Sequence, residues 1–217
     1  IVDPMLATGG SMEMGYKARV VTSAGSDTYA VMAAALSSLK GPKHGGANIK
    51  VVQMIADIKK HIYDTDDEEA VRKYLVDILD KKAFDKAGLI YGMGHAVYSI
   101  SDPRAEILRT LAERLAVEKG REKDLRLYQT IVKYAPDLIT ERKHAFTGVS
   151  ANVDMYSGFV YDMLGIPEEM FTPIFAIARI VGWSAHRIEE LVGGGKIIRP
   201  AYISISPERK YVPIEKR

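Results

Sequence analysis

The sequence predicts a mainly α-helical protein, and three observations carry this prediction. Apolar residues recur at intervals of three and four over most of the 217 residues. No stretch alternates apolar and polar residues convincingly, as a half-buried strand would. Glycine, proline and capping residues separate the periodic stretches. The longest apolar run, residues 170–183, is interrupted by Pro173 and Arg179, so we expect a core helix there and no membrane span.

The composition narrows the possible functions. With 47% hydrophobic and 27% charged residues, the chain is typical of a globular protein with one large or two small domains. A net charge of +2 does not indicate a strongly basic surface of the kind that binds nucleic acid or an anionic membrane. The absence of cysteine excludes disulfides, thiolate metal sites and cysteine nucleophiles, and it favours a cytoplasmic location. The first residues lack the basic and apolar regions of a signal peptide, so we expect none.

The first two predicted helices flank a glycine-rich corner. An alanine-rich run, residues 29–40, predicts a buried helix that Ser26 or Asp27 can cap. The corner follows as residues 41–48 (Gly-Pro-Lys-His-Gly-Gly-Ala-Asn), and Asn48 can cap the second helix. That helix places its apolar residues on one face: Val51, Met54, Ile55 and Ile58.

His44 lies inside this corner, between a proline and two glycines. Glycine leaves the backbone free to approach a ligand closely or to adopt positive φ. The residues of the corner alone leave two interpretations open, a ligand-facing histidine and a surface histidine at a turn between helices.

The next helix begins at a capping box, residues 65–68 (Thr-Asp-Asp-Glu). Its charged residues occupy one face, which we expect to be solvated. Its other face is apolar and consists of Val71, Tyr74, Leu75, Ile78 and Leu79.

Residues 89–98 (Leu-Ile-Tyr-Gly-Met-Gly-His-Ala-Val-Tyr) interrupt the helical pattern with a Gly-x-Gly turn and His95. Asp102 and Pro103 then begin another helix, as its N-cap and first residue. Arg104 lies in the first turn, where the helix dipole disfavours a positive charge. This position indicates either an anionic partner for Arg104 or a solvated side chain.

The helix that begins at Asp102 continues to Gly120, and residues 125–134 predict a further amphipathic helix that ends at Pro136. Residues 138–148 are polar, and we expect them to be irregular.

Asp154 lies among apolar neighbours where the next apolar segment begins, at residues 152–158. Desolvation would raise the pKa of such a carboxyl, which suits a general base. The alternative is a helix cap that faces water.

The last predicted helix runs from residue 168 to residue 191, and the glycines at 193–195 end it. Arg179 lies among its aliphatic residues. Because arginine is rarely buried without a partner, this position indicates either a carboxylate ligand or a structural salt bridge. The tail, residues 196–202, is expected to be extended.

Three stretches together resemble a known family. They are residues 41–48 around His44, residues 91–98 with the following Asp-Pro-Arg-Ala, and residues 152–158 (Asn-Val-Asp-Met-Tyr-Ser-Gly). In this order and spacing they resemble the signatures of citrate synthase. The helix around Arg179 and the Arg-Pro-Ala-Tyr at residues 199–202 extend the resemblance, which runs from about residue 19 to the C-terminus.

The resemblance implies condensation of acetyl-CoA with oxaloacetate to citrate and free CoA. Asp154 resembles the base that removes a proton from the acetyl methyl group. His44 resembles the group that hydrogen-bonds the thioester oxygen, and His95 resembles the histidine that acts on the oxaloacetate carbonyl. A positioned neutral imidazole and fork-shaped guanidinium groups suit this chemistry.

The resemblance also implies the residues that bind the substrates. Arg104, Arg179 and Arg199 resemble the arginines that bind carboxylates, with Arg199 reaching the partner subunit's site in a homodimer. The segment that recognises the adenine of CoA corresponds to Leu89, Ile90, Tyr91, Gly92, Met93 and Gly94. No metal and no tightly bound cofactor is implied, because CoA enters as a substrate.

The implied fold has two helical domains, with much of the N-terminal large domain missing. Residues 1–47 and 156–217 correspond to the large domain, and residues 48–155 to a small domain that closes over the substrates. Residues 1–18 are atypical, because Thr8 stands where the family has a histidine that binds oxaloacetate. We therefore expect exposed apolar surface or a partner that covers it.

Residues 2–11 also resemble the ribose-phosphate loop of uracil phosphoribosyltransferases, but the rest of the chain shows no such pattern and we assign no such activity.

The sequence thus predicts a transferase of the tricarboxylic acid cycle. Two alternatives stay open: a 2-methylcitrate synthase that uses propionyl-CoA, and a CoA-binding fragment that has lost turnover with the missing histidine.

Overall fold

The computed structural model describes residues 12–41, 46–95, 100–143, 148–199, 203 and 206–216. Apart from one isolated β-bridge between Met93 and Ala151, the regular structure of these residues is helical, as predicted. The helices are α2 (Met12–Ser23), α3 (Thr28–Leu39), α4 (Ala47–His61), α5 (Glu68–Leu79), α6 (Pro103–Lys119), α7 (Glu122–Lys143), α8 (Val153–Met163) and α9 (Phe171–Gly193), with short 3₁₀ turns at Glu168–Met170 and Ile214–Lys216.

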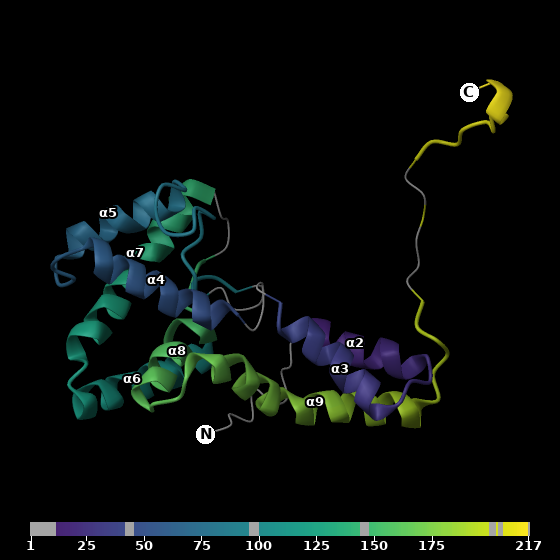
Figure 1. Cartoon of the computed structure of the whole chain (residues 1–217), viewed down its shortest axis with the longest axis horizontal. Coiled ribbons are helices and arrows are strands. Elements are labelled where there is room, and N and C mark those ends of the chain that lie inside the picture. Colours follow the sequence, from purple (N-terminus) through teal and green to yellow (C-terminus); the bar gives the residue numbers. More distant parts are fainter. Residues whose placement is uncertain are drawn as a thin grey trace.

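Two groups of helices form two hydrophobic cores (Figure 1). The larger core joins α4, α5, α6, α7 and α8, and α8 packs against both α4 and α6. Gly158 permits this packing, because a Cβ there would lie 2.6 Å from Val52 Cγ2 on α4. The largest fully buried side chains of this core are Met54, Ile58, Leu75, Ile78, Leu127, Ile131, Met155 and Tyr156.

The smaller core lies between α2, α3 and α9, and Trp183 is buried in it as expected. Close packing again depends on a glycine, since a Cβ on Gly15 would lie 2.8 Å from the ring of His186. Val153, the first residue of α8, contributes to this smaller core and Tyr161 packs against it, whereas the other buried apolar residues of α8 belong to the larger core. The domain division predicted at residues 47/48 and 155/156 stays a prediction.

Helix α7 does not end at Pro136 but continues through it to Lys143. A proline inside a helix removes one N–H donor and costs about 3 kcal/mol. Leu138 and Ile139 lie beyond it and are 3% and 8% exposed, so their burial offsets that cost. The prediction of an irregular segment after residue 138 was therefore wrong for most of its length.

The observed caps agree with the sequence at two helices and differ at two others. Asp27 accepts hydrogen bonds from the first turn of α3, and Asp102 accepts one from Arg104 N of α6, as predicted. The cap of α5 is Asp67, whereas the predicted capping box assigned this position to Thr65. Asn48 lies inside the first turn of α4 and does not cap that helix.

Residues 196–199, the described part of the predicted extended tail, form no helix, and residues 200–202 lie outside the described residues; the chain beyond α9 leads away from both cores (Figure 1). No helix in the described part of the chain is long and apolar enough to span a membrane.

Helix α9 carries a second apolar face that nothing covers among the described residues. Its members recur every three, four or seven residues and are 46–82% exposed: Ile177, Ile180, Val181, Ile188, Leu191 and Val192. A contiguous exposed apolar surface of this kind is typical of an interaction site. It agrees with the expectation that the chain exposes apolar surface.

We expect the double substitution Val181→Lys, Ile188→Lys to reduce self-association and the binding of an apolar fluorescent dye. The free energy of unfolding should change by less than about 0.5 kcal/mol, because both side chains are exposed. Sedimentation velocity, dye fluorescence and urea unfolding measure these effects. Trp183→Ala on the opposite face is the control, with a cost of about 3–5 kcal/mol. A comparable loss in the double variant would mean that the α9 face is packed in solution.

Candidate active site

The candidate site is organised where residues 92–94 pair with residues 150–152. Gly94 N donates to Ser150 O at 2.7 Å, and Asn152 N donates to Gly92 O at 2.9 Å. These bonds surround the bridge between Met93 and Ala151. They hold the segment that leads to His95 against the start of α8.

Asn152 serves both sides of this junction. Its Oδ1 accepts a hydrogen bond from Asp154 N at 2.9 Å, so Asn152, and not Asp154, is the N-cap of α8. Its Nδ2 donates to Gly94 O at 2.8 Å. One side chain therefore fixes both the backbone of Asp154 and the residue before His95.

Gly92 lets the glycine segment lie directly on α4 and α8. Its φ of +82° belongs to the left-handed region, which glycine adopts at little cost. A Cβ at this position would lie 2.9 Å from Met155 Cα and 3.0 Å from Val51 Cγ2. Any larger residue would push the segment away from the turn that carries Asp154.

Arg104 forms a paired cluster with Asp102 and His95. Its Nε and Nη2 donate to the two oxygens of Asp102 at 2.9 and 2.8 Å, and Nη2 also lies 3.2 Å from His95 Nε2. The anionic partner expected for Arg104 is therefore the buried Asp102 carboxylate. Burial opposes ionisation of Asp102, but the Arg104 guanidinium outweighs it and holds the pKa of Asp102 below its usual value.

The contact with Arg104 also assigns the tautomer of His95. A guanidinium only donates, so Nε2 of His95 accepts and its proton lies on Nδ1. Burial and the nearby Arg104 charge lower the pKa of His95 and keep the ring neutral near pH 7. A neutral imidazole with Nδ1–H can donate a hydrogen bond to a carbonyl oxygen.

Asp154, in the first turn of α8, is a desolvated carboxyl close to two arginines. Burial raises its pKa to about 6, although the charges of Arg179 and Arg104 act in the opposite direction. Among the described residues, none donates a hydrogen bond to the Asp154 carboxylate or forms an ion pair with it within 4.0 Å. The carboxylate therefore retains capacity to accept a proton.

Arg179 comes from α9 and is 8% exposed. Burial lowers its pKa, and the Asp154 charge counteracts this effect. Its guanidinium lies 5.2 Å from the ring centroid of Phe175, and its Nε has no hydrogen-bond partner among the described residues. The structural salt bridge left open by the sequence is absent in this part of the chain. A buried, incompletely satisfied guanidinium is the arrangement expected where a carboxylate ligand binds.

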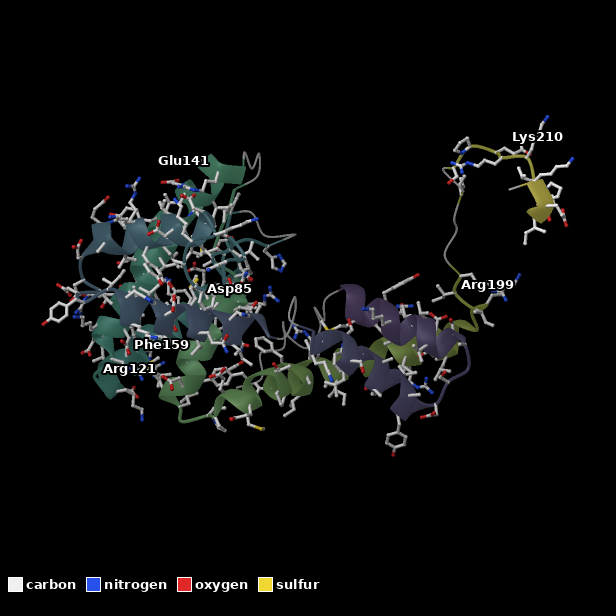
Figure 2. The ribbon with its side chains drawn as sticks, turned by 45° about the horizontal axis from the view of Figure 1, so that its top comes forward. Asp85, Arg121, Glu141, Phe159, Arg199 and Lys210 are labelled. Atoms are coloured by element: carbon white, nitrogen blue, oxygen red, sulfur yellow. The ribbon has the colours of Figure 1, made fainter. Side chains whose placement is uncertain are left out.

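The structure brings together part of the predicted site. His95, Arg104, Asp154 and Arg179 interact through the contacts and charges described above. Arg199 is exposed beyond the C-terminal end of α9, far from Phe159 of α8 (Figure 2). His44 and residues 1–11, including Thr8, lie outside the described residues.

Sequence reasoning missed two residues of this arrangement. It treated Asp102 only as a helix cap and gave Asn152 no role, although an asparagine two residues before Asp154 is a recognisable capping signal. The bond of Asn152 to Gly94 is not visible in a local pattern, whereas the partner of Asp102 is Arg104, two residues away.

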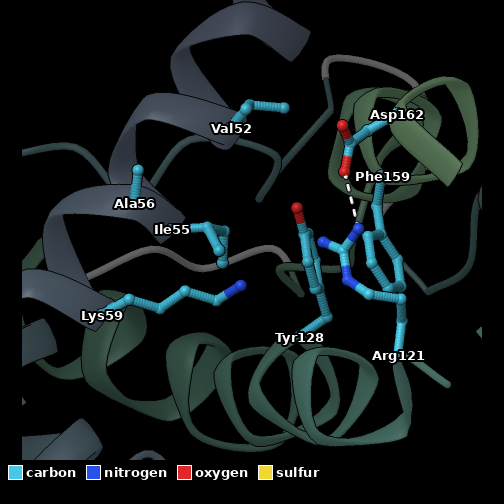
Figure 3. Close-up of a pocket in the computed structure, with 8 residues that line it drawn as sticks. All are labelled: Val52, Ile55, Ala56, Lys59, Arg121, Tyr128, Phe159 and Asp162. Carbon is cyan, nitrogen blue, oxygen red and sulfur yellow. Dashed lines mark hydrogen bonds and ion pairs between the residues drawn. The ribbon is translucent and has the colours of Figure 1, made fainter. Parts of the chain in front are cut away.

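A cavity of about 110 Å³ lies elsewhere, between α4, α7 and α8 (Figure 3). None of the predicted site residues lines it. Its cations are already paired, Arg121 with Asp162 at 3.0 Å and Lys59 with Asp124. We therefore do not assign the chemistry to this cavity.

Comparison with known proteins decides the family. Residues 16–201 match the family model for the C-terminal domain of citrate synthase. The chain is 40% identical over 203 residues to citrate synthase from Synechocystis, an alignment that covers 93% of this chain and 47% of that protein. It is 38% identical over 204 residues to 2-methylcitrate synthase from Shewanella oneidensis, an alignment that covers 93% of this chain and 48% of that protein.

The chain belongs to the citrate synthase family.

Solved structures agree with this assignment. Citrate synthase from Thermoplasma acidophilum, solved as a ternary complex with carboxymethyl-CoA and oxaloacetate, superposes with a TM-score of 0.75 at 32% identity. The superposition covers 98% of this chain and 53% of the Thermoplasma chain. Citrate synthase from Thermotoga maritima gives a TM-score of 0.73 at 34% identity, and the superposition covers 98% of this chain and 54% of the Thermotoga chain. The chain thus spans about half the length of the citrate synthases that it matches.

We expect Asn152→Ala to lower the free energy of unfolding by about 2–3 kcal/mol. The substitution removes a helix cap worth about 1 kcal/mol and a second bond, to Gly94 O. Asp27→Ala removes only the cap of α3 and is the matched control, with an expected loss of about 1 kcal/mol. Urea unfolding measures both. Equal losses would mean that the bond to Gly94 contributes nothing in solution.

We expect Asp154→Asn to stabilise the fold at pH 7.5. Because the folded-state pKa is about 6 and the ordinary value is 3.8, ionised Asp154 costs the folded state on the order of 2–3 kcal/mol above pH 6. Asparagine carries no charge, so the variant should gain that amount, and the gain should disappear as the pH falls from about 6 to about 4. Urea unfolding at pH 7.5 and pH 4 measures it. A destabilised variant at pH 7.5 contradicts a desolvated carboxylate.

Proposed function

We propose that this chain supplies the C-terminal part of a citrate-synthase-type active site and condenses acetyl-CoA with oxaloacetate to citrate and CoA. The observation that supports this most is Asp154, a desolvated carboxylate beside the charges of Arg104 and Arg179. Such a group combines a general base with cations that suit a dicarboxylate substrate.

Asp154 is the proposed base. Its pKa of about 6 makes it a stronger base than an ordinary carboxylate, and it is still mainly ionised at pH 7. A thioester α-proton is a very weak acid, so removal requires hydrogen bonding to the developing enolate oxygen. We assign that hydrogen bond to His44, on the resemblance of its glycine-rich corner to the family signature.

His95 and Arg104 are proposed to bind oxaloacetate. The inferred Nδ1–H of His95 can donate to the carbonyl oxygen that the enolate carbon attacks. Arg104 lies beside it, held by Asp102, and its guanidinium charge suits an adjacent carboxylate. Arg179 would take the second carboxylate, and its unsatisfied Nε supports this role.

The segment from Leu89 to Gly94 is proposed to recognise the adenine of CoA. Gly92 and Gly94 have φ of +82° and +85°, and a Cβ on Gly94 would meet no atom within 4 Å, which leaves room for a ligand beside the backbone there. We further propose a homodimer in which Arg199 completes the partner's site, a small domain that closes over the substrates, and a cytoplasmic role in the tricarboxylic acid cycle.

A 2-methylcitrate synthase is the second candidate, because relatives of that name match as well as citrate synthases do. The enzyme from Shewanella oneidensis is 38% identical, close to the 40% of the Synechocystis citrate synthase. The two reactions differ by one methyl group on the thioester, so the same residues serve both.

A CoA-binding fragment without turnover is the third candidate, since the chain spans about half of its relatives.

The test is release of free thiol from acetyl-CoA or propionyl-CoA in the presence of oxaloacetate. We expect release with the unmodified chain, a loss of at least about 10³-fold with Asp154→Ala because the base is removed, and unchanged binding of oxaloacetate. The ratio of rates with the two thioesters separates the first two candidates.

Asp162→Ala, on the exposed side of the same helix, is the control and should retain the rate of the unmodified chain. Binding of CoA without thiol release from either thioester supports the third candidate. A near-normal rate in Asp154→Ala contradicts the role of Asp154.

A further inference from the structure

A second polar cluster connects α4 with the loop between α5 and α6. Lys50 Nζ of α4 lies 3.2 Å from Asp85 Oδ2, and the Tyr91 hydroxyl donates to the same oxygen at 2.7 Å. The other carboxylate oxygen accepts from Ala87 N at 3.1 Å. Asp85, labelled in Figure 2, therefore holds three separate points of the chain.

Aromatic rings shelter this cluster. Lys50 Nζ lies 5.5 Å from the ring centroid of Phe84 and 5.8 Å from that of Tyr91, within the range of cation–π attraction. The two rings meet edge to face, with centroids 6.0 Å apart and an interplanar angle of 87°. The Asp85 side chain is 22% exposed, so its ion pair is less screened than a fully exposed one.

The loop that Asp85 stabilises is strained. Lys81, Phe84 and Lys86 have φ of 63°, 54° and 57°, in a region that side chains other than glycine rarely adopt. Such conformations persist only where the surroundings hold them, and they are concentrated at functional sites. The bonds to Asp85 come from Ala87 and Tyr91, which follow the strained residues, and from Lys50 of α4.

The same loop leads directly into the glycine segment. Gly92, next to Tyr91, lies against Val51 and Met155, so close packing fixes the segment at this residue. Tyr91, the residue before Gly92, is held by its hydroxyl group, which donates to Asp85. The segment is thus held between α4 and α8 by two separate attachments.

We propose that Asp85 is a positioning residue for binding of the nucleotide part of CoA, acting through Tyr91 and Lys50 on residues 89–94. The proposal rests on the proposed function, which assigns the adenine to this segment. Holding the segment in one conformation before the ligand arrives removes an ordering cost from binding. Burial opposes ionisation of Asp85, but the hydrogen bonds from Tyr91, Ala87 and Lys50 outweigh it and lower the pKa of Asp85. Burial and the nearby Asp85 raise the pKa of Tyr91 to about 12. Near pH 7 the Tyr91 hydroxyl therefore keeps its proton and donates it to an ionised Asp85.

Calorimetric titration of CoA into the full chain tests the proposal. We expect Asp85→Ala to weaken binding on the order of tenfold, because it removes hydrogen bonds to a charged group. Tyr91→Phe removes a single hydroxyl, is safe for folding, and should weaken binding about threefold to tenfold. Asp85→Glu keeps the charge and should recover most of the affinity.

The chain offers a matched control in Glu68. Its carboxylate accepts from Lys133 Nζ and, at 2.6 Å, from the Tyr134 hydroxyl, and Lys133 also lies over the Tyr134 ring. This cluster has the same chemistry but joins α5 to α7, and none of these contacts involves residues 89–94. Glu68→Ala should bind CoA with unchanged affinity.

Each contrary outcome has its own meaning. Affinity equal to that of the unmodified chain in both Asp85→Ala and Tyr91→Phe overturns the positioning role and leaves the proposed function standing. An equal loss in Glu68→Ala also overturns it, since the effect would then come from general destabilisation. No binding of CoA by the unmodified chain contradicts the proposed function, and the positioning role fails with it.

Discussion

The arrangement depends on the hydrogen bonds that join residues 92–94 to residues 150–152. They connect two segments almost 60 residues apart, one leading to His95 and the other into Asp154. Asn152 is the critical side chain, because it caps α8 and binds Gly94 O at the same time. Together with the packing of α6 on α8, this junction fixes the acid on α8 relative to the imidazole beside α6.

The charges around the junction cost stability and provide the chemistry. Asp154 is desolvated beside Arg104 and Arg179, and Arg179 Nε has no hydrogen-bond partner in the described part of the chain. A fold selected for stability alone would avoid such groups, whereas a site for a dicarboxylate needs them. The pair of Arg104 with Asp102 is different, because the two charges face each other directly and the pairing orients Arg104 toward His95.

Much of the fold could be predicted from helical periodicity. The apolar face of α5 and the cap of α6 were predicted correctly, because local patterns determine them. Helix α7 was not, since burial of Leu138 and Ile139 overrides the local effect of Pro136. The same limit applies to the candidate site. Family signatures predicted Asp154 and His95, but the bonds of Asn152 to Gly94 and of Asp85 to Lys50 join distant segments and leave no periodic signal.

The central claim is that Asp154 is a desolvated carboxyl lying beside the charge of Arg179. Carbon-13 NMR titration of the Asp154 carboxyl, in the unmodified chain and in Arg179→Met, tests it most directly. The account predicts a pKa of about 6 that rises further when the arginine charge is removed, because that charge lowers the pKa. A carboxyl that titrates near its ordinary value and does not respond to Arg179→Met would contradict it.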